Sequence, residues 1–137
     1  MTETIYREPL DQQLRHQVPA ELFGSFFPLR VEPFIFTIAS QLSDDYTGGY
    51  WEFYTLSNDA FYMAPVSERH FQVRCQNGYE GTLSPDAFGI TCCLYTFSNL
   101  SFDANETLAR ECAQQFHTLR DYMLGQEEVG AILAAID

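Results

Sequence analysis

The sequence has 137 residues, of which 46% are hydrophobic and 15% aromatic, which is enough for one domain with its own core and excludes a disordered chain. Nineteen acidic residues against seven arginines and no lysine give a formal net charge of -12. Because phosphate backbones and anionic membranes are bound by clustered lysine and arginine, we expect no direct nucleic-acid binding and no membrane association.

The N-terminal residues show no positively charged region followed by an apolar one, and no apolar run is long enough to span a bilayer. The four cysteines form no C-x-x-C pair. We therefore expect a cytoplasmic protein whose cysteine thiols are reduced and mostly buried.

Prolines predict the helices of the first forty residues. Pro9 and Pro19 each fit the start of a short helical segment, and Gly24 fits the end of the second. Pro33 fits the first turn of a longer helix that reaches about Leu42, since apolar residues recur there at three- and four-residue spacing.

A first β-hairpin is predicted over residues 46–65, which hold the only tryptophan of the chain. Asn58 and Asp59 suit a two-residue turn, which would place Leu56 opposite Phe61. Both faces of this hairpin are largely apolar. Either helices cover both faces, or one face is left as an aromatic patch for a partner.

A second hairpin is predicted over residues 70–83, with Asn77-Gly78 as its turn. A two-residue loop there would place Thr82 opposite Val73, which lines an apolar face poorly. A bulge or a longer loop would correct this register.

Three helices are predicted after the hairpins. Ser84-Pro85 begins an apolar, buried helix, and Asp103 with Glu106 forms a capping box for a longer amphipathic helix that ends near Gly125. A last apolar helix docks the C-terminus. The expected fold is one α+β domain over residues 1–137, with an antiparallel sheet of about four strands, from two consecutive hairpins, packed with N-terminal and C-terminal helices.

Residue types that carry catalysis are poorly placed for it. His70 and Cys75 lie five residues apart on one predicted strand, so their side chains point to opposite faces. No H-x-x-x-H or C-x-x-C spacing occurs, which predicts no metal and no cofactor. We expect no catalytic residue, although a carboxylate pair such as Glu52 with Asp45 leaves a small hydrolase open as an alternative.

An acidic surface also allows imitation of DNA. A mimic needs carboxylates in rows that approximate phosphate spacing, whereas acidic residues here run no longer than Asp44-Asp45 and Glu127-Glu128. A solvated acidic surface explains the charge better. A DNA-mimic inhibitor of a DNA-binding protein stays open as a second alternative.

Residues 45–58, Asp-Tyr-Thr-Gly-Gly-Tyr-Trp-Glu-Phe-Tyr-Thr-Leu-Ser-Asn, followed by Phe-Tyr-Met-Ala-Pro at residues 61–65, resemble the signature of the ArdB/KlcA antirestriction proteins. A weaker similarity extends over nearly the whole chain. One difference lies in the turn, where this chain has Asp59-Ala60 and family members commonly have two glycines.

The resemblance implies a small non-catalytic cytoplasmic inhibitor without a cofactor. Such proteins are carried by plasmids, prophages and other mobile elements, and they protect incoming DNA from type I restriction enzymes. The implied partner is a type I restriction-modification enzyme or an associated host protein. We expect a monomer or a weak dimer.

We expect the first hairpin and nearby charges to form the recognition surface, because an aromatic centre rimmed by charges is typical of protein interfaces. Its aromatic residues belong either to that interface or to the core, and the solvent exposure of Trp51 distinguishes the two. The candidate partner-binding residues are Arg15, Glu32, Asp45, Tyr46, Trp51, Glu52, Tyr54, Ser57 and Asn58.

Overall fold

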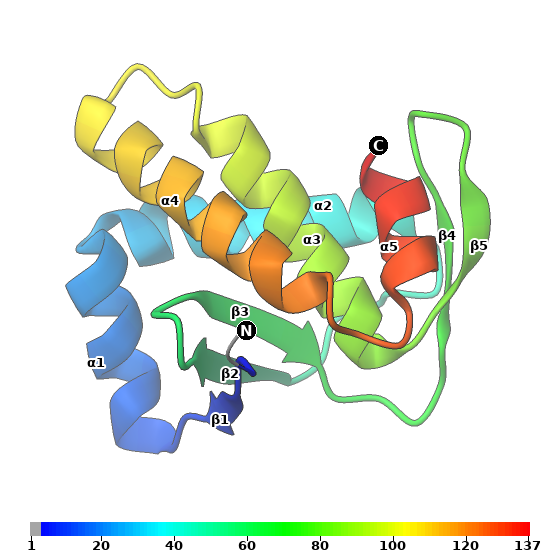
Figure 1. The fold of residues 1–137 in the computed structure, drawn as a ribbon, viewed down its shortest axis with the longest axis horizontal. Coiled ribbons are helices and arrows are strands. Elements are labelled where there is room, and N and C mark those ends of the chain that lie inside the picture. Colours follow the sequence, from blue (N-terminus) through cyan, green and yellow to red (C-terminus); the bar gives the residue numbers. More distant parts are fainter. Residues whose placement is uncertain (1–3) are drawn as a thin grey trace.

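In the computed structural model, which describes residues 4–137, four consecutive strands lie between N-terminal and C-terminal helices, and one short strand precedes the first helix (Figure 1). A π-helix, η1, leads directly into α2. In chain order the elements are β1 (Arg7–Pro9), α1 (Gln12–Phe23), η1 (Phe27–Val31), α2 (Glu32–Leu42), β2 (Trp51–Leu56), β3 (Phe61–Pro65), β4 (Phe71–Arg74), β5 (Glu80–Leu83), α3 (Pro85–Leu100), α4 (Glu106–Met123) and α5 (Val129–Ile136).

The strands form two antiparallel sheets. Strands β1, β2 and β3 form a three-stranded sheet with β2 in the centre, and β4 pairs with β5 in a separate sheet. Figure 1 shows the second sheet at the far side of α5 from the first. The α+β class and both hairpins are confirmed, but the hairpins are not neighbours in one sheet, and β1 is a further strand that was not predicted.

Helix side chains close the outer edge of β3, which explains why β4 does not pair with it. The backbone N–H of Phe61 donates to Oε1 of Gln115 on α4 over 2.9 Å. The thiol of Cys93 on α3 donates to the carbonyl oxygen of Met63 over 3.6 Å. A strand edge whose peptide groups are already hydrogen-bonded offers little to another strand.

The loop of the first hairpin is one residue longer than predicted. The N–H of Leu56 donates to the carbonyl of Ala60 over 2.8 Å, and Thr55 lies opposite Phe61. Asp59 has a φ of 69°, in the left-handed region that closes three-residue hairpin loops. The predicted pairing of Leu56 with Phe61 is therefore wrong by one position.

The second hairpin has the longer loop that its apolar pattern required. Val73 lies opposite Gly81 rather than Thr82. The N–H of Cys75 donates to the carbonyl of Tyr79 over 2.9 Å, which leaves three residues in the loop. Gly78 has a φ of 92°, a conformation that glycine adopts without strain.

Two N-terminal prolines have roles other than the predicted ones. Pro9 ends the edge strand β1, where its missing N–H is tolerated, and α1 begins only after its cap residue Asp11. Pro19 lies inside α1, which continues through it to the cap residue Gly24. The prediction for Pro33 is confirmed, because this residue lies in the first turn of α2.

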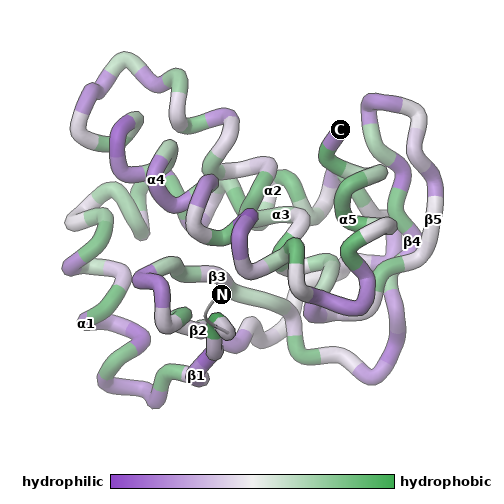
Figure 2. The backbone as a smooth tube through the Cα atoms, in the orientation of Figure 1, coloured by the Kyte–Doolittle hydropathy of each residue, from purple (hydrophilic) through white to green (hydrophobic). Residues whose placement is uncertain are grey.

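Helix α3 is the buried central helix, as predicted, and begins after the capping hydroxyl of Ser84. Helix α4 is amphipathic, and Figure 2 shows hydrophilic and hydrophobic residues alternating along it. Its cap residue is Asn105 and not Asp103. The Asp103 carboxylate instead accepts the N–H of Asn105 and forms an ion pair with Arg30.

Both faces of the first hairpin are covered. On one face the ring of Phe27 packs edge-on against Phe61, with 5.6 Å between ring centroids. On the other face Tyr62 lies beside Tyr122 of α4, at 5.8 Å. The helices before and after the hairpin therefore enclose it from both sides.

No helix between residues 4 and 137 is by itself long and apolar enough to cross a membrane. Helix α1 and the stretch Phe27–Leu42 meet that test of length and composition only as a pair, with a 92° bend between them.

Gly89 lies at a close contact between α3 and β3. A Cβ atom added there would lie 2.4 Å from the Cβ of Ala64 and 2.5 Å from the carbonyl oxygen of Met63. Real Cβ atoms do not approach other atoms so closely, and a packed core yields little. Only glycine allows this contact between helix and strand.

We predict opposite effects from the same substitution at two glycines. Gly89→Ala lowers the free energy of unfolding by about 1–3 kcal/mol, the usual cost of overpacking a core. Gly130→Ala on α5, where nothing lies within 4 Å of the added Cβ, raises it by about 0.5–1 kcal/mol because alanine is the better helix former. Urea unfolding followed by circular dichroism measures both, and a Gly89→Ala protein of unchanged stability would contradict the close contact.

Candidate functional site

Trp51 belongs to the core. Its side chain is 3% exposed and packs against the rings of Phe36 and Tyr46, with centroid distances of 5.4 and 5.6 Å. The indole N–H donates to the hydroxyl of Tyr46 over 3.2 Å. Trp51 and Tyr46 therefore stabilise the fold, and the expected aromatic surface patch does not form around Trp51.

Tyr54 and Glu52 lie on the opposite face of β2 from Trp51, and both are half-buried. The Tyr54 ring stacks on Tyr62 at 4.9 Å between centroids, and the guanidinium of Arg7 lies 4.5 Å from the Tyr54 centroid. Burial raises the pKa of the Tyr54 hydroxyl. Tyr54 thus faces a polar cluster and not open solvent.

That cluster joins β1, β3 and the first turn of α3. Nη1 of Arg7 donates to the hydroxyl oxygen of Tyr62 over 2.9 Å and to the carboxylate of Asp86 over 2.7 Å. The Tyr62 hydroxyl donates to the same carboxylate oxygen over 2.7 Å. Burial, together with the negative charge of Asp86, raises the pKa of Tyr62, so the phenol keeps the proton that it donates.

The cluster was missed in the sequence, and no pattern there indicates it. Arg7 and Asp86 are 79 positions apart, and Arg7 and Tyr62 are 55 apart. Only the pairing of β1 with β2 and the packing of α3 bring the three side chains together.

Ser57 and Asn58 fasten the tip of the first hairpin. Oγ of Ser57 accepts the N–H of Tyr6 over 2.9 Å. Nδ2 of Asn58 donates to the carbonyl of Thr118 on α4 over 2.8 Å. The polar atoms of these two predicted partner-binding residues are thus used to hold β1 and α4 against the hairpin.

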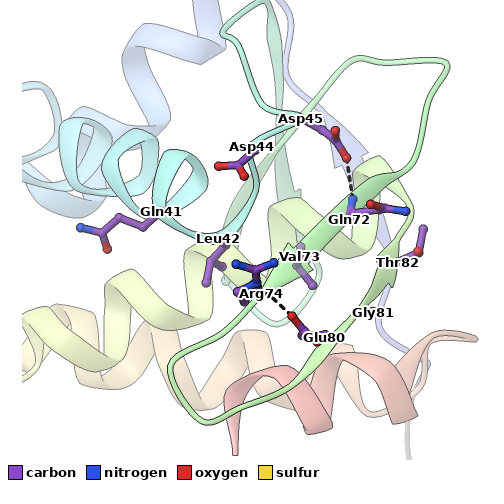
Figure 3. A pocket seen from close by; sticks show the side chains of 10 residues that line it. All are labelled: Gln41, Leu42, Asp44, Asp45, Gln72, Val73, Arg74, Glu80, Gly81 and Thr82. Carbon is purple, nitrogen blue, oxygen red and sulfur yellow. Dashed lines mark hydrogen bonds and ion pairs between the residues drawn. The ribbon is translucent and has the colours of Figure 1, made fainter.

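Asp45 lines a polar groove of about 520 Å³ between the end of α2 and the second hairpin, and no other predicted residue lines it. Figure 3 shows its carboxylate accepting the N–H of Gln72, over 2.9 Å, and Arg74 paired with Glu80. Because the Arg74–Glu80 pair is well exposed, it adds little stability. The groove is open to solvent and has an acidic wall.

Arg15 and Glu32, two further predicted residues from different helices, line one cavity. Both line a cavity of about 480 Å³ between α1, η1 and β2, whose apolar floor includes Phe27 and Phe53. Burial raises the pKa of Glu32, and the positive charge of Arg15 opposes this shift. This cavity combines an apolar floor with two opposite charges.

The thiols are poor nucleophiles. All four cysteines are free and buried. Burial raises the thiol pKa of each, to about 12 for Cys93 and Cys112, so little thiolate forms near neutral pH. Within residues 4–137, no group of three or more histidine, cysteine, aspartate or glutamate side chains is arranged to hold a metal ion.

We predict that Tyr62→Phe lowers the free energy of unfolding by about 1.5–3 kcal/mol, because its hydroxyl bonds two charged groups that would lose a partner. Tyr54→Phe is the matched control, since no hydrogen bond from the Tyr54 hydroxyl is found within residues 4–137 and its ring stays stacked on residue 62. The control should change stability by less than about 0.5 kcal/mol. Equal effects of the two substitutions in urea unfolding would contradict the bonding of Tyr62.

Comparisons with known proteins agree on one family. The model of the antirestriction protein family matches residues 44–137. Two KlcA antirestriction proteins of Escherichia coli are similar to this chain: one is 34% identical over 117 residues, covering 84% of this chain and 82% of KlcA, and the other is 37% identical over 111 residues, covering 80% and 76%. A solved structure of the KlcA and ArdB proteins matches with a TM-score of 0.90 at 30% identity, over 100% of this chain and 99% of that one. The chain therefore belongs to the antirestriction protein family, which confirms the resemblance noted at residues 45–58.

Proposed function

We propose that this protein protects incoming mobile-element DNA from type I restriction enzymes and that it acts in the cytoplasm through contacts with protein. The observation that carries this proposal is the match of the whole fold to KlcA and ArdB. Those proteins are described as active against type I DNA restriction systems in vivo but not in vitro. Shared fold and 30% identity over the full chain support the same activity here.

A role in binding, without catalysis or a cofactor, agrees best with the side chains. The cysteine thiols are buried and protonated near neutral pH. The polar groups of Tyr62 and Arg7 already form hydrogen bonds with each other and with Asp86. Such internally satisfied groups stabilise a fold rather than activate a substrate.

The direct partner is the type I restriction-modification enzyme or a host protein associated with it. An activity that relatives show in vivo and not in vitro favours a cellular component beyond purified enzyme and DNA. A DNA mimic would compete with DNA on purified enzyme as well. The behaviour of the relatives therefore favours protein contacts over imitation of DNA.

We predict that expression of the protein in a strain with a type I restriction system lets unmodified phage plate as efficiently as on a strain without that system. Phage already carrying the host modification should plate equally well with and without the protein, which controls for effects on growth. If unmodified phage plate no better when the folded protein is present, the proposed function is wrong.

A further inference from the structure

The cavity between α1, η1 and β2 is lined by apolar side chains and by two opposite charges that are not paired with each other within residues 4–137. Its volume is about 480 Å³, within the range of pockets that hold small ligands or single side chains. The floor is made by buried Phe27 and Phe53, and the rim by exposed residues including His16, Ser25 and Pro28. A cavity lined by both apolar and polar side chains suits an amphipathic guest.

The guanidinium of Arg15 is held rigidly at one side of this cavity. It lies 3.9 Å from the ring centroid of Phe53 and 4.7 Å from that of Tyr50. Its Nη1 donates to the carbonyl of Trp51 over 2.6 Å. The guanidinium has five N–H groups, so further donors remain for a guest in the cavity.

The carboxylate of Glu32, in the first turn of α2, faces the same cavity. Within residues 4–137, Arg15 and Glu32 do not form an ion pair, and no hydrogen bond to the Glu32 carboxylate is found. Burial raises the pKa of Glu32, and the positive charge of Arg15 opposes that shift. A group that both donates to Glu32 and accepts from Arg15 would satisfy the two side chains together.

The other face of the same sheet already contains such an arrangement. There the hydroxyl of Tyr62 accepts from Arg7 and donates to Asp86, while Arg7 lies over the ring of Tyr54. In the cavity Arg15 takes the place of Arg7, and Glu32 that of Asp86. The aromatic support is also present, since Arg15 lies over Phe53.

We propose that the cavity binds a tyrosine side chain of the partner protein, with the ring against the apolar lining of the cavity and the hydroxyl between Arg15 and Glu32. A phenol is the side chain that combines a flat apolar body with one atom able to donate and accept. One arginine and one glutamate in the lining also disfavour a guest with a net charge. Buried tyrosines are frequent anchors of protein interfaces.

This inference deepens the proposed function and rests on it only for the identity of the partner. It is tested on the full chain with N-acetyltyrosinamide as the probe, followed by nuclear magnetic resonance. We expect saturable shifts confined to residues that line the cavity, and at least tenfold weaker binding of N-acetylphenylalaninamide, which lacks the hydroxyl. No saturable shift with the tyrosine probe, or equal binding of the two probes, would overturn the proposal.

Two tryptophan substitutions on the same helix give a matched pair. His16→Trp places a large side chain on the rim, while Gln13→Trp changes an equally exposed position that does not line the cavity. We expect His16→Trp to abolish probe binding and restriction relief, and Gln13→Trp to keep both, with both proteins folded by circular dichroism. Unchanged probe binding by folded His16→Trp would refute the site.

The outcomes separate the two proposals. If wild-type protein binds the tyrosine probe at the cavity but fails to relieve restriction, the proposed function is wrong and the tyrosine site stands. If wild type relieves restriction and His16→Trp relieves it equally, the cavity is not the contact with the partner and the inference fails.

Discussion

Burial of β3 on both faces is the constraint on which the rest of the structure depends. All five of its residues are buried, and its outer edge is bonded by Gln115 and Cys93. A strand in this position must be covered by helices, and Gly89 lets α3 come close enough to do so. The second hairpin is thereby excluded from the first sheet and packs elsewhere, with Phe71 stacked on Phe88 of α3 at 4.5 Å.

Local chemistry made most elements predictable. The cap at Ser84, the proline at residue 33, the apolar composition of α3 and the amphipathic pattern of α4 each depend on neighbours a few residues away, and each prediction agrees with the structure. The division into two sheets was not predictable. It depends on side chains of α3 and α4 reaching a strand edge some thirty to fifty positions away, as Gln115 does for Phe61 over 54 positions. Register failed at Asp59 because a left-handed aspartate is indistinguishable in sequence from an ordinary turn residue.

The aromatic motif of residues 45–58 carries the family resemblance, but its residues serve the fold more than the surface. Trp51 lies in the core and donates a hydrogen bond to the partly buried Tyr46, and Ser57 and Asn58 hold neighbouring elements. Motif recognition locates such residues without distinguishing core from interface, because both favour aromatic side chains. Only burial in three dimensions separates the two.

The motif is linked to the cavity through Arg15. The carbonyl of Trp51 and the rings of Tyr50 and Phe53 fix the guanidinium, so the motif determines where the charge lies although most of its own side chains are unavailable to a partner. An arginine and a carboxylate lie on each face of the sheet that contains β2, but their hydrogen bonding differs. On one face, arginine, tyrosine and aspartate are bonded within the chain, while on the other the arginine and glutamate remain apart. In the proposed complex, the tyrosine hydroxyl of the partner would supply to Arg15 and Glu32 the hydrogen bonds that Tyr62 supplies within the chain to Arg7 and Asp86.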